Sequence, residues 1–218
     1  MDAMTADVVP LAIAIAASPF TIIPAILLLF TPRARATSLT FLAAWLVALV
    51  VGVTVFVLLA STSEGYEETP TWVAWTRIVL GAALIVLGIR QWLARHTPKP
   101  TPAGMHRIET ATPRTALRLA VLLAYANPKV LLMTAAAGLS IGAAELDTTA
   151  TGVAIAVFTV VASLSIAVPV LLYAVLGERM LGPLTRMRDW LEQHSAFIMS
   201  IVILVIGVMV LVEGISGL

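Results

Sequence analysis

The chain has 218 residues, of which 60% are hydrophobic and only 11% are charged, and its mean hydropathy is +1.02. Soluble domains carry about 25% charged residues, so this composition excludes an ordinary soluble protein and indicates an integral membrane protein. The net charge of +1 gives no basis for nucleic-acid binding, and the lack of cysteine excludes disulfides and thiolate metal sites. The histidines His96, His106 and His194 lie in polar connectors without ligand-like spacing, so we expect no metal and no other cofactor.

Six apolar runs reach the roughly 20 residues that a helix needs to cross the hydrocarbon core of a bilayer. They cover residues 8–30, 39–60, 72–93, 116–141, 151–176 and 196–212. The acidic Asp2 and Asp7 stand where a signal peptide would carry positive charge, so we interpret the first run as a retained transmembrane helix. The sequence therefore predicts an all-α integral membrane protein with six transmembrane helices.

The basic residues predict the orientation of these helices. Eleven of the thirteen Lys and Arg residues lie in or beside the first, third and fifth connectors, whereas the second and fourth connectors carry only acidic charges. Basic connectors stay in the cytoplasm, so we expect a multi-pass protein of the cell inner (plasma) membrane with both termini extracytoplasmic. The two exceptions are Arg77, which we expect to snorkel to the outer interface, and Lys129, in the middle of the fourth run.

The fourth run contains a proline, an amide and a lysine at its centre, namely Asn127, Pro128 and Lys129. Proline removes a helical hydrogen bond, and a lysine at bilayer depth costs roughly 2.5–3.5 kcal/mol on insertion scales. A similar break, Ser18-Pro19, interrupts the first run, and the two prolines are 128 − 19 = 109 residues apart, half the chain length. The sequence therefore predicts that helices one and four are broken at corresponding positions.

Three helices in each half make the second half start from the opposite side of the membrane. We therefore predict a 3+3 inverted-topology repeat, with halves at residues 1–93 and 113–218 joined by a cytoplasmic Pro/Thr-rich connector at 94–112. Helix breaks at corresponding positions of two such halves are the best sequence indication of a transporter binding site. The alternative is that these prolines only kink ordinary membrane helices.

The predicted substrate-binding or pathway residues are polar groups and helix breakers at membrane depth: Ser18, Pro19, Pro24, Tyr125, Asn127, Pro128, Lys129, Ser163 and Ser165. Lys129 is a candidate for binding an anionic head group, for carrying a proton, or for a structural bond to carbonyls freed by Pro19 or Pro24. Serines in membrane helices more often bond their own backbone or pack against a neighbour. The sequence shows no catalytic constellation, and we do not expect an enzyme.

Two further patterns concern packing and the membrane surface. The segment 183–193 places Leu184, Met187, Trp190 and Leu191 on one helical face and charged residues on the other, which predicts a short interfacial helix. The alternative is that this helix only covers the underside of the bundle. The spacing of Gly138 and Gly142 indicates a small-residue face for close helix packing, within the bundle or between protomers. Thr112-Pro113 is typical of an N-cap followed by proline at the first helical position.

Several motifs together resemble a known family. They are Ser18-Pro19 with LFTPRAR (29–35), AYANPK (124–129) with AAGLSIGAA (136–144), ASLSIAVPV (162–170), and GER (177–179) with RDWL (188–191). In order and extent they resemble the mycobacterial and wider actinobacterial lipid-addressing family, which includes the sulfolipid-1-addressing and glycopeptidolipid-addressing proteins. The Asn-Pro-Lys motif alone also occurs across the wider lysine exporter superfamily, which has a similar six-helix plan.

This resemblance implies an inner-membrane transporter or flippase that exports an envelope lipid, with a glycolipid as the expected substrate, toward the cell surface. It implies functional roles for Asn127, Pro128 and Lys129. Membrane lipids are the expected partners, and a homodimer or a partner lipid exporter or synthase is compatible with the sequence. Two alternatives stay open: an exporter of a small solute such as an amino acid, and a non-transporting scaffold for lipid export or synthesis machinery.

Overall fold

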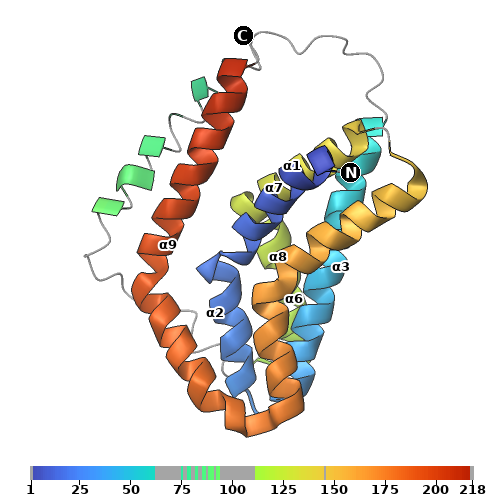
Figure 1. Cartoon of the computed structure of the whole chain (residues 1–218). Helices are drawn as coiled ribbons and strands as arrows, with labels where there is room; N and C mark the ends of the chain where they lie inside the picture. Colours follow the sequence, from blue (N-terminus) through green and yellow to red (C-terminus); the bar gives the residue numbers. More distant parts are fainter. Residues whose placement is uncertain are drawn as a thin grey trace. The chain divides into compact units, whose positions relative to one another are not determined.

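All regular secondary structure in the described part of the chain is helical in the computed structural model (Figure 1), which describes residues 2–61, 75, 78–79, 82, 85–86, 88–90, 92–93, 111–144 and 146–216. Its elements are α1 (Asp2–Ala16), α2 (Pro19–Leu27), η1 (Leu28–Phe30), α3 (Ala34–Ser61), α6 (Pro113–Tyr125), α7 (Pro128–Ala143), α8 (Thr148–Leu176), η3 (Gly177–Met180) and α9 (Leu181–Ser216). The prediction of an all-α protein is confirmed for these residues.

The apolar helices identify a membrane protein. Among the described residues, two helical segments are long and apolar enough to cross a membrane, Ala34–Ala60 and Thr148–Leu191. Two bent helix pairs pass the same test when each counts as one span: Val8–Ala16 with Pro19–Phe30, and Pro113–Tyr125 with Pro128–Ala143. These segments contain the predicted spans one, two, four and five. The predicted third span and the connector 94–112 lie mostly outside the described residues.

The chain divides into two compact units. The first comprises Met1–Glu64 and Thr101–Asp189, and the second comprises Gly65–Pro100 and Trp190–Leu218. Each unit therefore takes segments from both predicted halves of the chain.

Helix α3 lies at the centre of the first unit, where it contacts α6, α7 and α8, while α1 contacts α7 and α8. Tyr125 of α6 donates a hydrogen bond from its hydroxyl to the Ala48 carbonyl of α3 at 2.7 Å. Further along, a Cβ added at Gly138 of α7 would lie 2.5 Å from the Phe56 Cβ. The later residue of α6–α7 contacts the later residue of α3, so α3 runs parallel to the bent pair α6–α7.

The small-residue face of α7 packs within the bundle. A Cβ at Gly138 would also lie 2.7 Å from the Val53 carbonyl oxygen, and one at Gly142 would lie 2.5 Å from the Ala60 Cβ. Only glycine permits this approach of two backbones. The interpretation of these glycines as a packing face is confirmed for the contact with α3.

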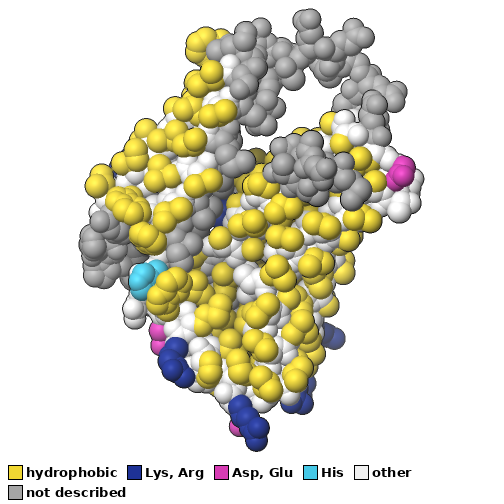
Figure 2. Space-filling view, viewed as in Figure 1, with side chains coloured by type: hydrophobic (Ala, Val, Ile, Leu, Met, Phe, Trp, Pro, Cys, Tyr) yellow, Lys and Arg dark blue, Asp and Glu magenta, His cyan; other side chains and the backbone are white. Residues whose placement is uncertain are grey.

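The described arginine side chains of the first unit lie near three helix starts, while hydrophobic side chains cover most of the visible surface (Figure 2). They are Arg33 and Arg35 before and at the start of α3, Arg114 and Arg118 in α6, and Arg179, Arg186 and Arg188 in η3 and early α9. Figure 2 shows Lys and Arg side chains gathered at the lower end of the view. Two contacts join the start of α3 to η3 and early α9. Arg188 lies over the Phe30 ring at 6.0 Å, and the Arg35 guanidinium lies 3.7 Å from the Cβ position built at Gly177.

The second unit pairs the predicted third and sixth spans. The Trp92 and Phe197 rings have centroids 5.2 Å apart, and a Cβ at Gly88 would lie 2.7 Å from the Leu204 Cγ. Later residues of one segment therefore meet earlier residues of the other, so the two segments run antiparallel.

The start of α9 differs from the prediction, whereas the start of α6 agrees with it. Residues 183–193 do not form a separate interfacial helix, because α9 is continuous from Leu181 to Ser216. Pro183 lies in the first turn, where its missing N–H is not needed, and no proline or glycine stops the helix before Ala196. The Thr112 hydroxyl accepts a hydrogen bond from the Thr115 amide at 3.4 Å, which confirms the predicted N-cap before Pro113.

Candidate functional site

Two helix breaks with nearly the same backbone geometry form the centre of the candidate site. Helices α1 and α2 bend by 47° at their junction, and α6 and α7 bend by 65°. Ser18 (φ −82°, ψ 112°) and Asn127 (φ −85°, ψ 108°) are the N-caps, and a proline follows each as the first helical residue. Proline lacks the N–H that would continue the preceding helix, and it favours an extended residue before it. The predicted breaks at Ser18-Pro19 and Asn127-Pro128 are confirmed.

The two caps differ in what their side chains do. The Asn127 Oδ1 accepts a hydrogen bond from the Lys129 amide at 3.1 Å, and the Asn127 carbonyl accepts one from the Leu131 amide at 3.0 Å. Asn127 therefore stabilises the first turn of α7. The Ser18 side chain caps no amide, although its carbonyl accepts the Thr21 hydroxyl at 2.8 Å. Ser18 is completely buried, and its Oγ has no hydrogen-bond partner among the described residues.

Lys129 lies in the first turn of α7 with its ammonium enclosed. The side chain is half-buried, and Nζ is shielded from solvent without a hydrogen-bond partner among the described residues. The structure therefore shows no bond from Lys129 to the carbonyls near Pro19 or Pro24, which the structural alternative requires. Burying an unpaired charge is costly unless a counter-charge or a set of hydrogen bonds offsets it. An anionic group of a substrate would supply both.

Helix α8 contributes further polar atoms to the core of this unit. Ser163 and Thr159 are 1% and 3% exposed, and neither hydroxyl has a hydrogen-bond partner in the described part of the chain. The elements that carry Ser18, Lys129 and Ser163 contact one another: α1 packs against α7 and α8, α2 packs against α8, and α7 packs against α8. A buried hydroxyl without a partner costs about 1–3 kcal/mol, so these hydroxyls are candidates for contact with a polar ligand.

The remaining predicted residues divide between structural positions and the surface. The hydroxyl of Tyr125 joins α6 to α3, which is a structural contact. Pro24 is half-buried inside α2, which continues from Pro19 to Leu27, so the prediction that Pro24 breaks the helix is wrong. Pro128 is exposed as the first residue of α7. Ser165 is half-buried and lines a groove that sequence reasoning did not predict. Thr134 was also missed; it is 3% exposed, and its hydroxyl has no partner among the described residues.

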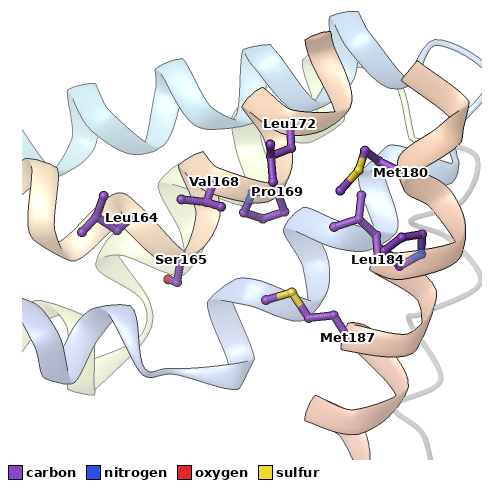
Figure 3. A pocket seen from close by; sticks show the side chains of 9 residues that line it. Leu164, Ser165, Val168, Pro169, Leu172, Met180, Leu184 and Met187 are labelled. Atoms are coloured by element: carbon purple, nitrogen blue, oxygen red, sulfur yellow. The ribbon is translucent and has the colours of Figure 1, made fainter. Parts of the chain in front are cut away.

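The groove has a volume of about 410 Å³ and lies between α8 and the segment formed by η3 and α9. Figure 3 shows side chains from both segments pointing toward it. Its lining is apolar except for Ser165: Leu164, Ser165, Val168, Pro169, Leu172, Met180, Pro183, Leu184 and Met187. Pro169 follows Ser165 by four residues and cannot donate to the Ser165 carbonyl, although α8 continues through it as one helix from Thr148 to Leu176.

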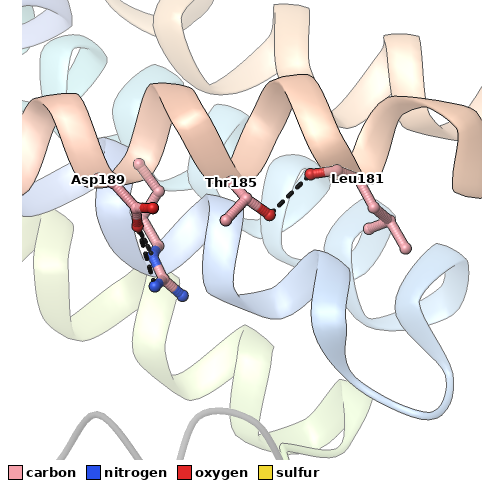
Figure 4. A network of polar contacts seen from close by, with 4 residues as sticks. Leu181, Thr185 and Asp189 are labelled. Atoms are coloured by element: carbon pink, nitrogen blue, oxygen red, sulfur yellow. Dashed lines mark hydrogen bonds and ion pairs between the residues drawn. The ribbon is translucent and has the colours of Figure 1, made fainter.

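The first turns of α9 hold their polar groups in local contacts (Figure 4). Arg188 and Asp189 form an ion pair with an Nη2–Oδ1 distance of 3.0 Å, and the Thr185 hydroxyl donates to the Leu181 carbonyl at 2.8 Å. Arg188 is therefore engaged, whereas Arg179 and Arg186 are exposed. Within the described ranges, no three His, Asp or Glu side chains lie close enough to hold a metal ion.

Comparison with known proteins identifies one family. The family model described as "Sap, sulfolipid-1-addressing protein" matches residues 8–216, which include both helix breaks and the groove. No curated protein and no solved structure matches the chain.

Proposed function

Because the chain belongs to the sulfolipid-1-addressing protein family, which implies a lipid-related membrane function, we propose that it is an inner-membrane transporter that exports an envelope glycolipid toward the cell surface. The observation that carries this proposal is the pair of matching helix breaks, one of which lies beside the half-buried Lys129, whose enclosed ammonium has no partner among the described residues. Discontinuous helices at corresponding positions are a common way to build a transporter binding site.

The two compact units support the inverted repeat within this proposal. The first unit contains predicted spans one and two with their counterparts four and five, and the second unit contains span three with its counterpart six. A 3+3 repeat accounts for this division, because equivalent helices of the two halves then belong to the same unit. The two bent pairs also fall at equivalent positions, spans one and four.

The distribution of charge supports the orientation that we propose. The basic helix starts of the first unit lie together, whereas Asp147 caps the start of α8 through a hydrogen bond from the Ala150 amide. Connectors rich in Arg stay in the cytoplasm, so the basic end would face the cytoplasm and both termini would face outward.

The candidate site favours an anionic substrate group. Helices α2 and α7 begin at the two breaks, and the N-terminus of each carries a partial positive charge. The Lys129 ammonium adds a full positive charge. A sulfate, phosphate or carboxylate head group would be attracted there, whereas a cationic solute would be repelled. Acyl chains can stay in the bilayer while such a head group crosses, and none of these steps needs a catalytic residue.

The experiment that tests the proposal is lipid movement in liposomes that contain only the purified protein. An anionic glycolipid with a fluorescent label is placed in the membrane, and its access to an external quencher is followed over time. We expect movement by the wild type, loss of movement with Lys129→Ala, and wild-type rates for the matched control Arg118→Ala, which removes an exposed charge on α6. A wild type that moves no lipid at all would contradict transport and favour a scaffold that needs a partner exporter or synthase.

A further inference from the structure

We propose that the groove between α8 and the η3–α9 segment binds an acyl chain of a membrane lipid whose anionic head group pairs with Arg179 and Arg186. The inference rests on the proposed function, which supplies a lipid substrate, and it adds a second site at the basic end of the first unit. The site at the helix breaks would receive the head group during crossing. The groove would hold the lipid beforehand.

The size and lining of the groove suit a hydrocarbon chain. Its volume of about 410 Å³ lies within the roughly 300–1,000 Å³ of ordinary ligand sites. On α8 it extends from Leu164 to Leu172, eight residues or about 12 Å along the helix axis. Met180 and Met187 line the opposite side, and methionine adapts its shape to variable apolar ligands. Figure 3 shows both sulfur-containing side chains directed toward the α8 residues.

Two residues, Pro169 and Gly177, set the local structure beside the groove. Pro169 lies inside α8 and cannot donate to the Ser165 carbonyl, so one helical hydrogen bond is missing beside the groove. Gly177 then adopts a positive φ of 63°, which ends α8 and lets η3 and α9 turn back along it. A side chain other than glycine would be strained at this position.

The charges beside the groove favour an anionic head group. Arg179 precedes the lining residue Met180, Arg186 precedes the lining residue Met187, and both guanidinium groups are exposed. The joined starts of α3 and α9 together carry five basic residues (Arg33, Arg35, Arg179, Arg186 and Arg188) and two acidic ones (Glu178 and Asp189), a balance of 5 − 2 = +3. Asp189 is already paired with Arg188, so it does not neutralise the two exposed arginines.

The chain offers a direct test because it contains no cysteine. A small fluorophore is attached to Val168→Cys, at the half-exposed rim of the groove, and to the control Val160→Cys, an exposed position of α8 that does not line it. Each labelled protein is reconstituted in phosphatidylcholine vesicles. The vesicles contain a small, equal fraction of either phosphatidylglycerol or phosphatidylcholine with a quenching spin label on the acyl chain.

We expect the anionic lipid to quench the Val168 label about thirtyfold more effectively than the neutral lipid, since each of the two arginines near a membrane surface contributes about 1 kcal/mol. The two lipids should quench the Val160 label equally. The double variant Arg179→Gln with Arg186→Gln should abolish the difference at Val168. Equal quenching by both lipids at Val168 in the wild-type background would overturn the proposal.

Photo-crosslinking to the unlabelled wild type covers the case in which the fluorophore itself fills the groove. Phosphatidylglycerol with a diazirine on its acyl chain should give adducts on peptides that contain Met180 and Met187, and the double arginine variant should give several-fold fewer. Adducts that are unchanged in the double variant would also overturn the proposal. Neither measurement requires transport. Loss of the anionic preference with intact lipid movement therefore contradicts only the groove, and the reverse result contradicts only the proposed function.

Discussion

Ser18 and Asn127 occupy equivalent positions in two different helix pairs, with backbone angles that differ by 3° in φ (−82° and −85°) and 4° in ψ (112° and 108°). They are 127 − 18 = 109 residues apart in a chain of 218. Each is the N-cap of the helix after the break, and each is followed by a proline as the first helical residue. Their side chains have different partners, because Asn127 caps its helix and Ser18 does not. An inverted repeat would account for the similar backbone angles at Ser18 and Asn127, and a difference in role between the two halves would account for the different side-chain contacts.

This difference predicts unequal effects of removing the two side chains. Asn127→Ala should lower the free energy of unfolding by about 1 kcal/mol, because the Lys129 amide loses its cap. Ser18→Ala should leave stability unchanged or raise it, because it removes a buried hydroxyl that has no partner in the described part of the chain. Thermal unfolding of the purified proteins in the same detergent measures both. Equal destabilisation by the two substitutions would show that the Ser18 hydroxyl has a structural partner.

The second prediction separates function from stability at Lys129. Lys129→Met keeps the aliphatic length but removes an enclosed ammonium that has no described partner. We expect the thermal midpoint to stay the same or rise, because the cost of burying an unpaired charge disappears. Lipid movement in liposomes should fall at least about tenfold, which corresponds to about 1.4 kcal/mol of lost interaction with an anionic group.

A conservative substitution provides the control for this experiment. Lys129→Arg retains the positive charge and should preserve more of the lipid movement than Lys129→Met. If Lys129→Met unfolds the protein, the ammonium has a structural role, and the assignment to substrate binding is wrong.

Much of the first unit could be predicted from the sequence because its determinants are local. Proline disfavours helix at the residue before it, so Pro19 and Pro128 predicted both breaks. Pro24 and Pro169 lie inside continuous helices, so proline alone does not show which positions break. Glycines four residues apart on an apolar helix predicted the close approach of α7 to a neighbour. The identity of that neighbour, α3, depends on how distant segments pack, which periodicity does not reveal.

The same limit explains what sequence reasoning missed. The hydrogen bond from Tyr125 to Ala48 joins residues 77 positions apart, and the groove is formed by two segments that meet only after Gly177 turns the chain. Residues 183–193 are helical, as their amphipathic pattern predicted, but such a pattern does not show where a helix ends. No stop signal follows it, so α9 continues to Ser216.

A third prediction concerns the link between α6 and α3. Tyr125→Phe removes only the hydroxyl that donates to the Ala48 carbonyl at 2.7 Å. Hydrogen bonds between membrane helices contribute about 0.6 kcal/mol on average, so we expect a loss of about 0.5–1.5 kcal/mol in the free energy of unfolding. Lipid movement should be retained, because the hydroxyl is committed to a structural contact. Loss of lipid movement at unchanged stability would instead place Tyr125 in the pathway.

The last prediction uses two glycines of the same unit that differ in their surroundings. A Cβ at Gly138 would lie 2.5 Å from the Phe56 Cβ and 2.7 Å from the Val53 carbonyl oxygen, so Gly138→Ala must push α7 away from α3. Such overpacking costs about 1–3 kcal/mol. A Cβ at Gly152 of α8 meets no atom within 4 Å, so Gly152→Ala should be neutral or stabilise the helix by about 0.5–1 kcal/mol.

Thermal unfolding in one detergent compares the two variants directly. Gly138→Ala should unfold at a lower temperature than the wild type, and Gly152→Ala should unfold at the same temperature or a higher one. Because α7 carries Lys129 in its first turn, a displaced α7 should also slow lipid movement in the Gly138 variant. Unchanged stability and unchanged movement with alanine at position 138 would mean that α3 and α7 do not pack as closely in the membrane as the structure shows.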